Sequence, residues 1–229
     1  MNRAFVDVWT VDLAAGDLDL IVASALLSVD ELDRLATLQN PFLRRRYLAV
    51  RVRVRQILSQ YLQLDPAELV FVRGEFGKPA LDNQSVFFNV SHTENCLVLA
   101  VASFEAVGVD VERISLRRNL HGLAKRCLSA VEFEFWLGQP EALQTELFYQ
   151  FWVGKEAFVK AVGRGIVAGL EDCQLNLPEL DGFAAIPHDY GVAEDWQLRR
   201  LKCWEGLVAS LVTPALDYQL AYKVCGLKS

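Results

Sequence analysis

Trp152-Val-Gly-Lys155-Glu156-Ala-Phe-Val-Lys160-Ala-Val-Gly163 closes an apolar segment, residues 143–162, that predicts one long helix. Residues 152, 156 and 160 recur at every fourth position and therefore share one face of that helix. Apolar side chains cover so much of the remaining circumference that the charges cannot all be freely solvated. A carboxylate between two lysines fits a metal ligand, or a base flanked by phosphate-binding cations. A salt-bridged surface helix is the alternative interpretation.

The predicted elements follow one order twice along the chain: helices come first and strands follow them. Residues 41–64 predict another long amphipathic helix, with an unusually basic surface. Two capping boxes, Ser28-Val-Asp-Glu31 and Ser129-Ala-Val-Glu132, predict the starts of further helices. Apolar or alternating runs predict strands at residues 5–11, 69–72, 86–90, 96–103, 107–112, 196–203, 207–212 and 218–224. We expect the three runs between residues 86 and 112 to form an antiparallel meander.

The twofold order predicts an α+β fold, built as a pseudo-dimer of two similar halves. Each half is expected to be a small antiparallel sheet with a long helix. We place the N-terminal half at residues 1–106 and the C-terminal half at residues 107–229. No literal sequence repeat or low-complexity linker is visible between them.

Composition and charge exclude several classes of protein. The chain has 229 residues, of which 52% are hydrophobic, as in an ordinary globular protein. It has 23 Lys and Arg against 29 Asp and Glu, and the resulting net charge of −6 disfavours nucleic-acid binding. No apolar stretch approaches the roughly 20 residues of a membrane span, and residues 1–12 lack a targeting core, so we expect a cytoplasmic protein. Five scattered cysteines without Cys-x-x-Cys indicate reduced, mostly buried side chains rather than disulfides or zinc ligands.

Val107-Gly-Val-Asp110-Val-Glu112 is predicted to be a strand that carries two acids on one face. Because side chains alternate along a strand, Asp110 and Glu112 point to the same side and the valines between them point into the core. Neighbouring carboxylates repel each other unless a divalent cation lies between them. Oxygen ligands without clustered Cys or His favour magnesium over zinc. For an isolated Asp-x-Glu, a solvated acidic edge strand is the better interpretation.

Two turn-like segments carry further candidate ligands. Phe88-Asn-Val-Ser91-His92 ends a strand, where a hydroxyl, an imidazole and backbone N–H groups are offered to an anion. Glu75-Phe-Gly77-Lys78-Pro79 combines a cation with a glycine that permits close backbone approach. Either segment alone is a weak indication, because a lone histidine is more often structural and Gly-Lys-Pro turns are common.

Taken in order, the four motifs resemble the 4'-phosphopantetheinyl transferase superfamily, specifically its long, surfactin-synthetase-activating type. The resemblance covers residues 44–165. It is carried most specifically by the strand with Asp110 and Glu112 and by the helix with Lys155, Glu156 and Lys160. Members of the short type are much smaller and trimeric, whereas the long type resembles two such folds fused.

The resemblance implies an enzyme that binds coenzyme A and magnesium and modifies a serine of apo acyl, polyketide or peptidyl carrier proteins. It implies that Asp110, Glu112 and Glu156 hold magnesium, with Glu156 also the candidate base, directly or through water. Lys155 and Lys160 are implied to neutralise phosphate oxygens during the transfer, and Lys160 is the surer contact with coenzyme A. The adenine and phosphate end of coenzyme A is assigned to Gly77, Lys78, Pro79, Ser91 and His92. His92 is expected to bind rather than to act as a base.

The basic helix supplies the candidates for holding the 3'-phosphate of coenzyme A. Arg46-Tyr-x-x-x-Arg51-x-x-x-Arg55 resembles the pattern of relatives. Leu43 stands where some relatives have a lysine or arginine, so either Arg44 substitutes for it or the 3'-phosphate is held less tightly. Arg51 is the preferred contact, whereas a solvated face explains Arg45, Arg53 and Arg55 at least as well.

Carrier proteins are typically acidic, so local positive charge must attract them to an enzyme that is itself acidic. The basic helix and a second patch are expected to dock them, the patch comprising Leu116, Arg117, Arg118, Leu120, Leu123, Lys125 and Arg126. We expect a monomer without nucleic-acid or membrane partners. Two rival functions stay open: an inactive module that binds carrier protein or coenzyme A, and a magnesium-dependent pyrophosphate hydrolase. The complete set of acids and lysines argues against the first rival.

Overall fold

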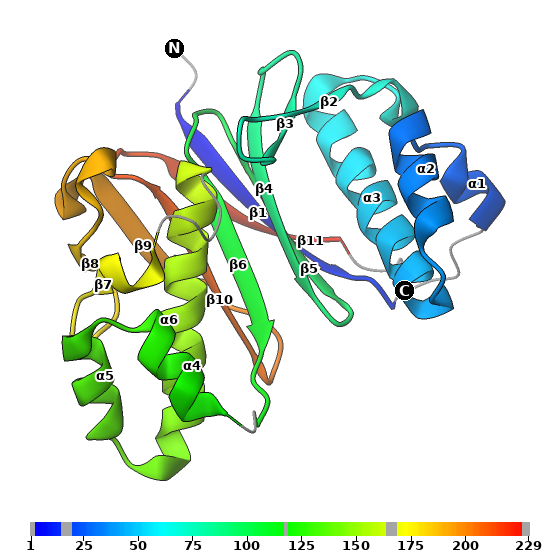
Figure 1. Ribbon diagram of the computed structural model, residues 1–229. Helices are drawn as coiled ribbons and strands as arrows, with labels where there is room; N and C mark the ends of the chain where they lie inside the picture. The colour runs from blue at the N-terminus through cyan, green and yellow to red at the C-terminus, as the bar shows by residue number, and fades with distance from the viewer. Residues whose placement is uncertain (1–2, 15–19, 117–118, 164–168, 226–229) are drawn as a thin grey trace.

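The computed structural model describes residues 3–14, 20–116, 119–163 and 169–225. They form two bodies side by side, each with a long helix lying on a small sheet (Figure 1), which confirms the predicted α+β fold class. The first body contains β1 (Phe5–Asp12), α1 (Leu20–Ser24), α2 (Val29–Thr37), α3 (Pro41–Leu62), η1 (Pro66–Glu68), β2 (Phe71–Arg73), β3 (Pro79–Leu81), β4 (Phe87–Thr93) and β5 (Cys96–Ala102). The second contains β6 (Gly108–Arg113), α4 (Leu120–Cys127), α5 (Ala130–Leu137), α6 (Glu141–Val162), η3 (Leu170–Asp172), β7 (Gln174–Leu175), β8 (Phe183–Ala185), η4 (His188–Tyr190), η5 (Ala193–Asp195), β9 (Trp196–Arg200) and β10 (Leu207–Pro214).

The last strand, β11 (Gln219–Cys225), leaves the second body and completes the sheet of the first. The first sheet has the strand order β11-β1-β5-β4, and the second has the order β6-β10-β9. Neighbouring strands in both sheets are antiparallel, except that β11 pairs with β1 in parallel. The blue and red strands of Figure 1 therefore lie together although they come from opposite ends of the chain.

The two long helices match in length. α3 and α6 each have 22 residues. Side-chain caps are present at the start of α3 and of the shorter helices α2 and α5. The Asn40 side chain accepts hydrogen bonds from the first free N–H groups of α3. Both predicted capping boxes are present, Ser28 with Glu31 at α2 and Ser129 with Glu132 at α5. The predicted helix starts are thus confirmed.

The central strand β5 is buried along its whole length because its two faces pack against different bodies. Leu97 and Leu99 contact the apolar side of α3, whereas Val98 packs with Val109 and Val111 of β6. A strand covered on both faces reads as a continuous apolar run, which is the pattern that this segment shows. The hydrophobic core therefore continues from one body into the other.

Two further findings concern the cysteines and the helices. All five cysteines are unpaired, and Cys96, Cys127 and Cys173 are buried. No helix among the described residues is both long enough and apolar enough to cross a membrane.

The strand β6 does not continue the predicted meander, and that prediction is wrong. It pairs with β10 in the second sheet and lies beside β4 of the first. Side chains of β4 bond to its backbone: Asn89 Oδ1 accepts from Val109 N–H at 2.9 Å, and Ser91 Oγ accepts from Val111 N–H at 3.3 Å. These polar side chains satisfy backbone groups that an unpaired edge would leave open. The two bodies therefore meet at a seam between β4 and β6.

A close approach between backbones fixes the distance from β6 to α6. A Cβ atom at Gly108 would lie 2.0 Å from the carbonyl oxygen of Ala157 and 2.4 Å from the nitrogen of Ala161. Only glycine fits at such a contact. Asp110, two residues further along β6, is thereby held against the turn of α6 that carries Lys160.

Candidate active site at the seam between the two bodies

Asp110 is the centre of a hydrogen-bonded cluster at the seam. Its side chain is buried, and its Oδ1 accepts from Lys160 Nζ at 2.6 Å and from the Ser91 hydroxyl at 2.7 Å. Lys160 also donates to Ser91 Oγ at 3.0 Å. Three elements, β4, β6 and α6, thus contribute one residue each. Ser91 bonds within this cluster and orients Asp110. The sequence predicts only that Ser91 contacts the adenine and phosphate end of coenzyme A.

Glu156 joins the cluster from one turn earlier on α6. Within the described part of the chain, its buried Oε1 has no hydrogen-bond partner, and neither does Asp110 Oδ2. Burial raises the pKa of Glu156, and repulsion from Asp110 and Glu112 raises it further, while the charge of Lys160 acts in the opposite direction. Buried carboxylate oxygens without partners are costly, so this arrangement is suited to a cationic ligand.

The donor chemistry fits a hard cation such as magnesium. Asp110 and Glu156 offer buried carboxylate oxygens, and the half-buried Glu112 lies near enough to act on the pKa of Glu156. Among the residues that the structure describes, no three His, Cys, Asp or Glu side chains are gathered closely enough to hold an ion by themselves. Magnesium usually keeps several waters and takes only one or two carboxylates together with phosphate oxygens. The predicted acids are therefore neighbours in a partial site that a phosphate ligand could complete.

Lys155 lies outside this cluster, which corrects the expectation that it contacts a phosphate. Its side chain is fully buried, and its Nζ donates to Glu132 Oε2 at 2.6 Å and to the carbonyl oxygens of Cys127 and Leu170, each at 2.9 Å. An ammonium group has three N–H donors, and all three are used. Adjacent residues of a helix point about 100° apart, so Lys155 and Glu156 face different neighbours.

The Gly-Lys-Pro turn of the first body contacts the end of α6. Gly77 has φ +83°, a conformation that favours glycine, in the turn that connects β2 and β3. From that turn, Lys78 Nζ donates to the carbonyl oxygens of Val107 at 3.0 Å and Ala161 at 3.1 Å. Burial lowers the pKa of Lys78 to about 8, against the opposing charge of Glu105. Lys78 therefore ties the two bodies together and has only one N–H left for a ligand.

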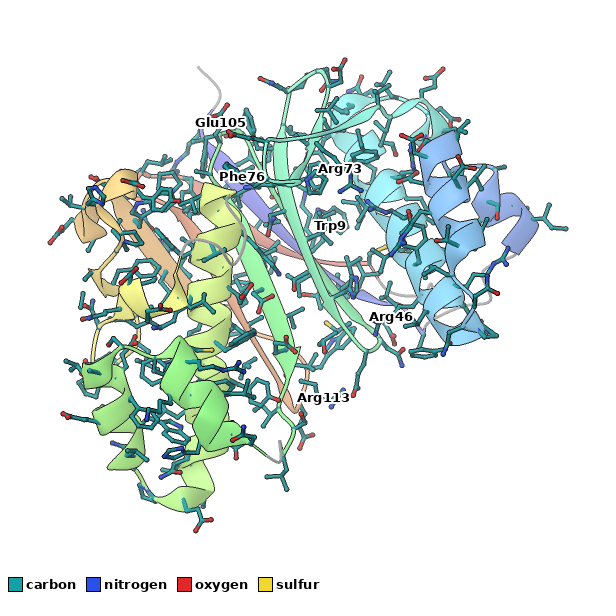
Figure 2. The ribbon with its side chains drawn as sticks, in the orientation of Figure 1. Trp9, Arg46, Arg73, Phe76, Glu105 and Arg113 are labelled. Carbon is teal, nitrogen blue, oxygen red and sulfur yellow. The ribbon has the colours of Figure 1, made fainter. Side chains whose placement is uncertain are left out.

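A mostly apolar cavity of about 520 Å³ opens beside this turn. Its lining includes Phe76, Lys78, Pro79, Glu105, Tyr190 and Trp196. Figure 2 shows Phe76 and Glu105 near the C-terminal end of α6. This cavity lacks the cations that gather beside α3, so the two regions suit different chemical groups.

Cations from α3 and α6 surround His92 at the end of β4. Partial burial and then the positive charges of Arg46 and Lys160 lower the pKa of His92, and Arg51 adds to the effect. Figure 2 shows Arg46 toward the N-terminal end of α3. The lowered pKa favours the neutral imidazole of His92, and the positive charges around it suit an anion. The sequence pattern includes Arg46 but does not single it out.

The remaining arginines of α3 differ in their surroundings. Arg44 is exposed in the first turn. Arg51 is half-buried over the Tyr47 ring, at 5.4 Å from its centroid, and lines a cavity of about 530 Å³ together with Arg34 and Arg73. Arg55 is 1% exposed and its Nε donates to Glu31 Oε2 at 2.8 Å. The interpretation of Arg55 as part of a solvated face is wrong, because a buried carboxylate neutralises it.

The expected docking patch on the second body is only partly described. Arg117 and Arg118 lie outside the described residues. Lys125 and Arg126 are exposed on α4, and Leu116 is 93% exposed. Leu120 and Leu123 pack partly buried against the core, so they offer less apolar contact area than the sequence predicts.

Sequence reasoning passes over three residues that build the site. Asn89 and Gly108 hold β6 against β4 and α6, and Glu132 is recognised only as part of a capping box. A glycine inside a strand does signal close backbone approach, so Gly108 could be found from its pattern. The partners of Asn89 and Glu132 are distant in sequence, and no local pattern reveals them.

The chain is similar to known proteins over both of its halves. A model of the 4'-phosphopantetheinyl transferase superfamily matches residues 106–221, and a model of the N-terminal region of 4'-phosphopantetheinyl transferase matches residues 17–105. The 4'-phosphopantetheinyl transferase HetI of Nostoc sp. is 31% identical over 218 residues, which cover 93% of this chain and 90% of that protein. A phosphopantetheinyl transferase of Thraustochytrium sp. is 30% identical over 207 residues, covering 81% of this chain and 70% of that protein.

A further relative is the 4'-phosphopantetheinyl transferase Sfp of Bacillus subtilis. It is 34% identical over 139 residues, which cover 59% of each chain. Both halves of the sequence are thus matched by models of one enzyme family, and one relative is similar over nearly its full length. The chain therefore belongs to the 4'-phosphopantetheinyl transferase superfamily and is an enzyme of the transferase class.

Proposed function

We propose that the protein transfers the 4'-phosphopantetheine group of coenzyme A to a serine of an apo acyl, polyketide or peptidyl carrier protein, with magnesium bound at the seam. The other product is 3',5'-adenosine bisphosphate. One observation carries the proposal: Asp110 Oδ2 and Glu156 Oε1, two buried oxygens without a hydrogen-bond partner among the described residues, belong to the same cluster as the ammonium of Lys160. Oxygens that need a cation, next to a cation that can bind an anion, suit a diphosphate with its magnesium ion.

Asp110 and Glu156 are the residues that would hold magnesium, with Glu112 as the third acid on the same side. When bound, the ion supplies charge neutralisation for the diphosphate during the transfer. Lys160 would bind a phosphate oxygen and stabilise the negative charge that develops there. Ser91 keeps Asp110 oriented through its 2.7 Å hydrogen bond.

The transfer forms a bond between the serine oxygen and the β-phosphorus of coenzyme A. The bond from that phosphorus to the oxygen that bridges to the α-phosphate breaks, and the serine proton must be removed. Glu156 is the candidate base, directly or through a water molecule. Its raised pKa favours this role, because a base is most effective when its pKa lies near the working pH.

We assign the adenosine end of coenzyme A to the cationic region beside α3. Arg46 and Arg51 act on His92, which makes Arg46 a better candidate than Arg44 for holding the 3'-phosphate. The adjoining cavity of about 530 Å³ is also lined by Arg73 and by Pro79 of the Gly-Lys-Pro turn. Its volume lies in the range of small-molecule sites. Gly77 and Lys78 would shape the turn beside coenzyme A. Lys78 would contribute little free charge, because two of its N–H groups already bond to carbonyl oxygens.

The decisive experiment incubates an apo carrier protein with coenzyme A, with and without magnesium, and follows the carrier by mass spectrometry. We expect the phosphopantetheine adduct to appear only with the metal. Consumption of coenzyme A without an adduct would support the pyrophosphate hydrolase, and binding without consumption would support the inactive module. A panel of acyl, polyketide and peptidyl carriers would identify the acceptor class.

The same proposal includes a monomeric enzyme in the cytoplasm whose halves are residues 1–106 and 107–229. Light scattering of the purified protein tests whether it is a monomer, and a dimer would contradict the proposal. Fractionation of the source cells tests the cytoplasmic location. A boundary near residue 106 is supported by the seam, because β4 and β6 come from different sheets, whereas β11 at the end of the second half crosses back to complete the sheet of the first.

A further inference from the structure

Lys155 and Glu132 form a buried connection point beneath the α6 helix. The Lys155 side chain is 0% exposed and that of Glu132 is 1% exposed, and their charged atoms lie 2.6 Å apart. Glu132 Oε2 also accepts from Ser129 N–H at 2.8 Å, and Glu132 Oε1 accepts from Leu175 N–H at 2.8 Å. With the two carbonyl contacts of Lys155, the pair joins α4, α5, η3 and β7 to α6. We refer to this pair and its partners as the Lys155 hub.

The first body contains a corresponding hub around Arg55 and Glu31. Arg55 and Lys155 each lie fourteen residues after the first residue of a 22-residue helix. Each cation bonds to the glutamate of a capping box at a preceding helix, Glu31 at α2 and Glu132 at α5. Each also donates to carbonyl oxygens in or next to the 3-10 helix that follows its long helix. The repetition shows that this connection belongs to the architecture of both bodies.

The two hubs differ in the residue that follows the cation. Gln56 follows Arg55, whereas Glu156 follows Lys155. On the side of α6 toward β6, Gly108 touches the helix backbone and prevents it from moving closer. On another side, the Lys155 hub holds the same turn of the helix. The rotation and height of α6, and with them the direction of the Glu156 carboxylate, are therefore fixed from two directions.

We infer that Lys155 is a positioning residue, which acts through Glu132 and α6 to aim Glu156 at the reacting group. This inference rests on the proposed transfer function. It differs from a phosphate-binding role, because all three N–H donors of Lys155 are already used inside the protein. Misplacing a reacting group by about 1 Å can cost about 100-fold in rate, so an intact hub has a large effect without touching substrate.

The test compares matched double variants of the two hubs. Lys155→Met with Glu132→Gln removes both charges from the second hub while roughly keeping side-chain volume. Arg55→Met with Glu31→Gln does the same in the first hub, where no catalytic residue follows. Because Glu31 also pairs with Arg51 at 3.7 Å and lines the cavity assigned to coenzyme A, this variant is a control for kcat at saturating coenzyme A and not for KM. For both variants, melting temperature, kcat at saturating coenzyme A and KM for coenzyme A are measured. Lys155→Arg, which keeps the charge and its pairing with Glu132, provides a variant with a milder effect on folding.

We expect both double variants to lose stability, but only the Lys155 pair to lose kcat, by about 100-fold, with KM for coenzyme A within about twofold of the unchanged enzyme. Lys155→Arg should lower kcat by about 10-fold with the same unchanged KM. A KM that rises 10-fold or more in Lys155→Arg, with kcat unchanged, would instead make Lys155 a phosphate ligand. Unchanged kcat and KM in both Lys155→Arg and the double variant Lys155→Met with Glu132→Gln would reduce the hub to a purely structural role. Failure of the unmodified enzyme to modify any carrier would overturn the proposed function itself, before any variant is compared.

Discussion

The long helices α3 and α6 are built alike but used differently. Each has 22 residues and carries one buried cation paired with the glutamate of a capping box. On α6, Glu156 and Lys160 follow that cation and point into the seam. On α3, the half-buried Gln56 and the exposed Gln60 occupy the same places. The hub therefore belongs to the fold, and the two charges after it are the ones to which we assign the chemistry.

The surroundings of the two helices explain why only α6 contributes to the cluster around Asp110. α6 contacts β6 so closely that Gly108 has no room for a Cβ atom, and Asp110 of that strand faces Lys160. Gln56 on α3 instead accepts a hydrogen bond from Arg53 of its own helix, at 3.1 Å. The facing strand β6 thus supplies α6 with a complementary carboxylate, whereas Gln56 bonds within its own helix.

The largest effect should follow from removing the carboxylate that distinguishes α6 from α3. Glu156→Gln is nearly isosteric and deletes the proposed base, which is also a proposed magnesium ligand, so we expect kcat to fall about 1,000-fold. The melting temperature should stay level or rise, because a buried carboxylate with a raised pKa is lost. Carrier modification by mass spectrometry and circular dichroism measure the two quantities. Gln56→Glu is the matched control and should leave kcat unchanged; comparable turnover in Glu156→Gln would contradict its role.

The close contact of β6 with α6 should be the next most sensitive feature. Gly108→Ala forces a methyl group into the helix backbone, so we expect a loss of about 3 kcal/mol in the free energy of unfolding. Urea denaturation measures it. At Gly74, a Cβ would meet only the carbonyl oxygen of Lys78 at 3.6 Å, an ordinary contact. Gly74→Ala should therefore cost well under half as much, and equal losses would show that the β6–α6 contact is not special.

Removing the second charge of α6, that of Lys160, should have a smaller effect, and this effect should be on coenzyme A binding. Lys160→Ala removes the ammonium proposed to hold a phosphate oxygen, and the loss of one charge-assisted hydrogen bond should raise KM for coenzyme A about 30-fold. Steady-state kinetics with varied coenzyme A measures the change. Gln60→Ala, at the corresponding position of α3, should leave KM unaltered. An unchanged KM in Lys160→Ala would remove this residue from the coenzyme A site.

The smallest effect concerns Lys78, which joins the two bodies. Its pKa is lowered from 10.5 to about 8, so between these values the unfolded chain binds more protons than the folded one. The free energy of unfolding therefore gains from Lys78 as pH rises, by about 1 kcal/mol between pH 8 and pH 9. Urea denaturation at each pH measures the free energy of unfolding of the unmodified protein and of Lys78→Met. The contribution of Lys78 is the difference between these two free energies. If the two profiles run parallel, the amine is not held in the buried state described.

Local sequence patterns predict the elements and most of the acidic site. Capping boxes define the starts of α2 and α5 because the interacting groups are only three residues apart. The Asp110 strand and the Glu156 helix are found because alternation and helical spacing order side chains over short distances. The strand and helix are predicted separately, however, and only the folded seam shows that Lys160 reaches Asp110.

The features that escape prediction all depend on contacts between distant parts of the chain. A cation in an amphipathic helix looks the same whether it faces solvent or a buried glutamate, which explains the misplacement of Arg55 and Lys155. The pairing of β6 with β10 depends on side chains of β4 that occupy its other edge. Apolar alternation identifies a strand but does not choose its neighbour.

The parallel pairing of β11 with β1 has a consequence for how the chain folds during its synthesis. β11 follows β5 by more than a hundred residues, so at ordinary rates of translation the ribosome needs roughly 5–25 s to supply it after the first body is complete. Throughout that interval one edge of β1 presents open backbone groups, which is the condition that invites pairing with other nascent chains. Chaperone capture of the emerging polypeptide should therefore be strongest before β11 leaves the ribosome.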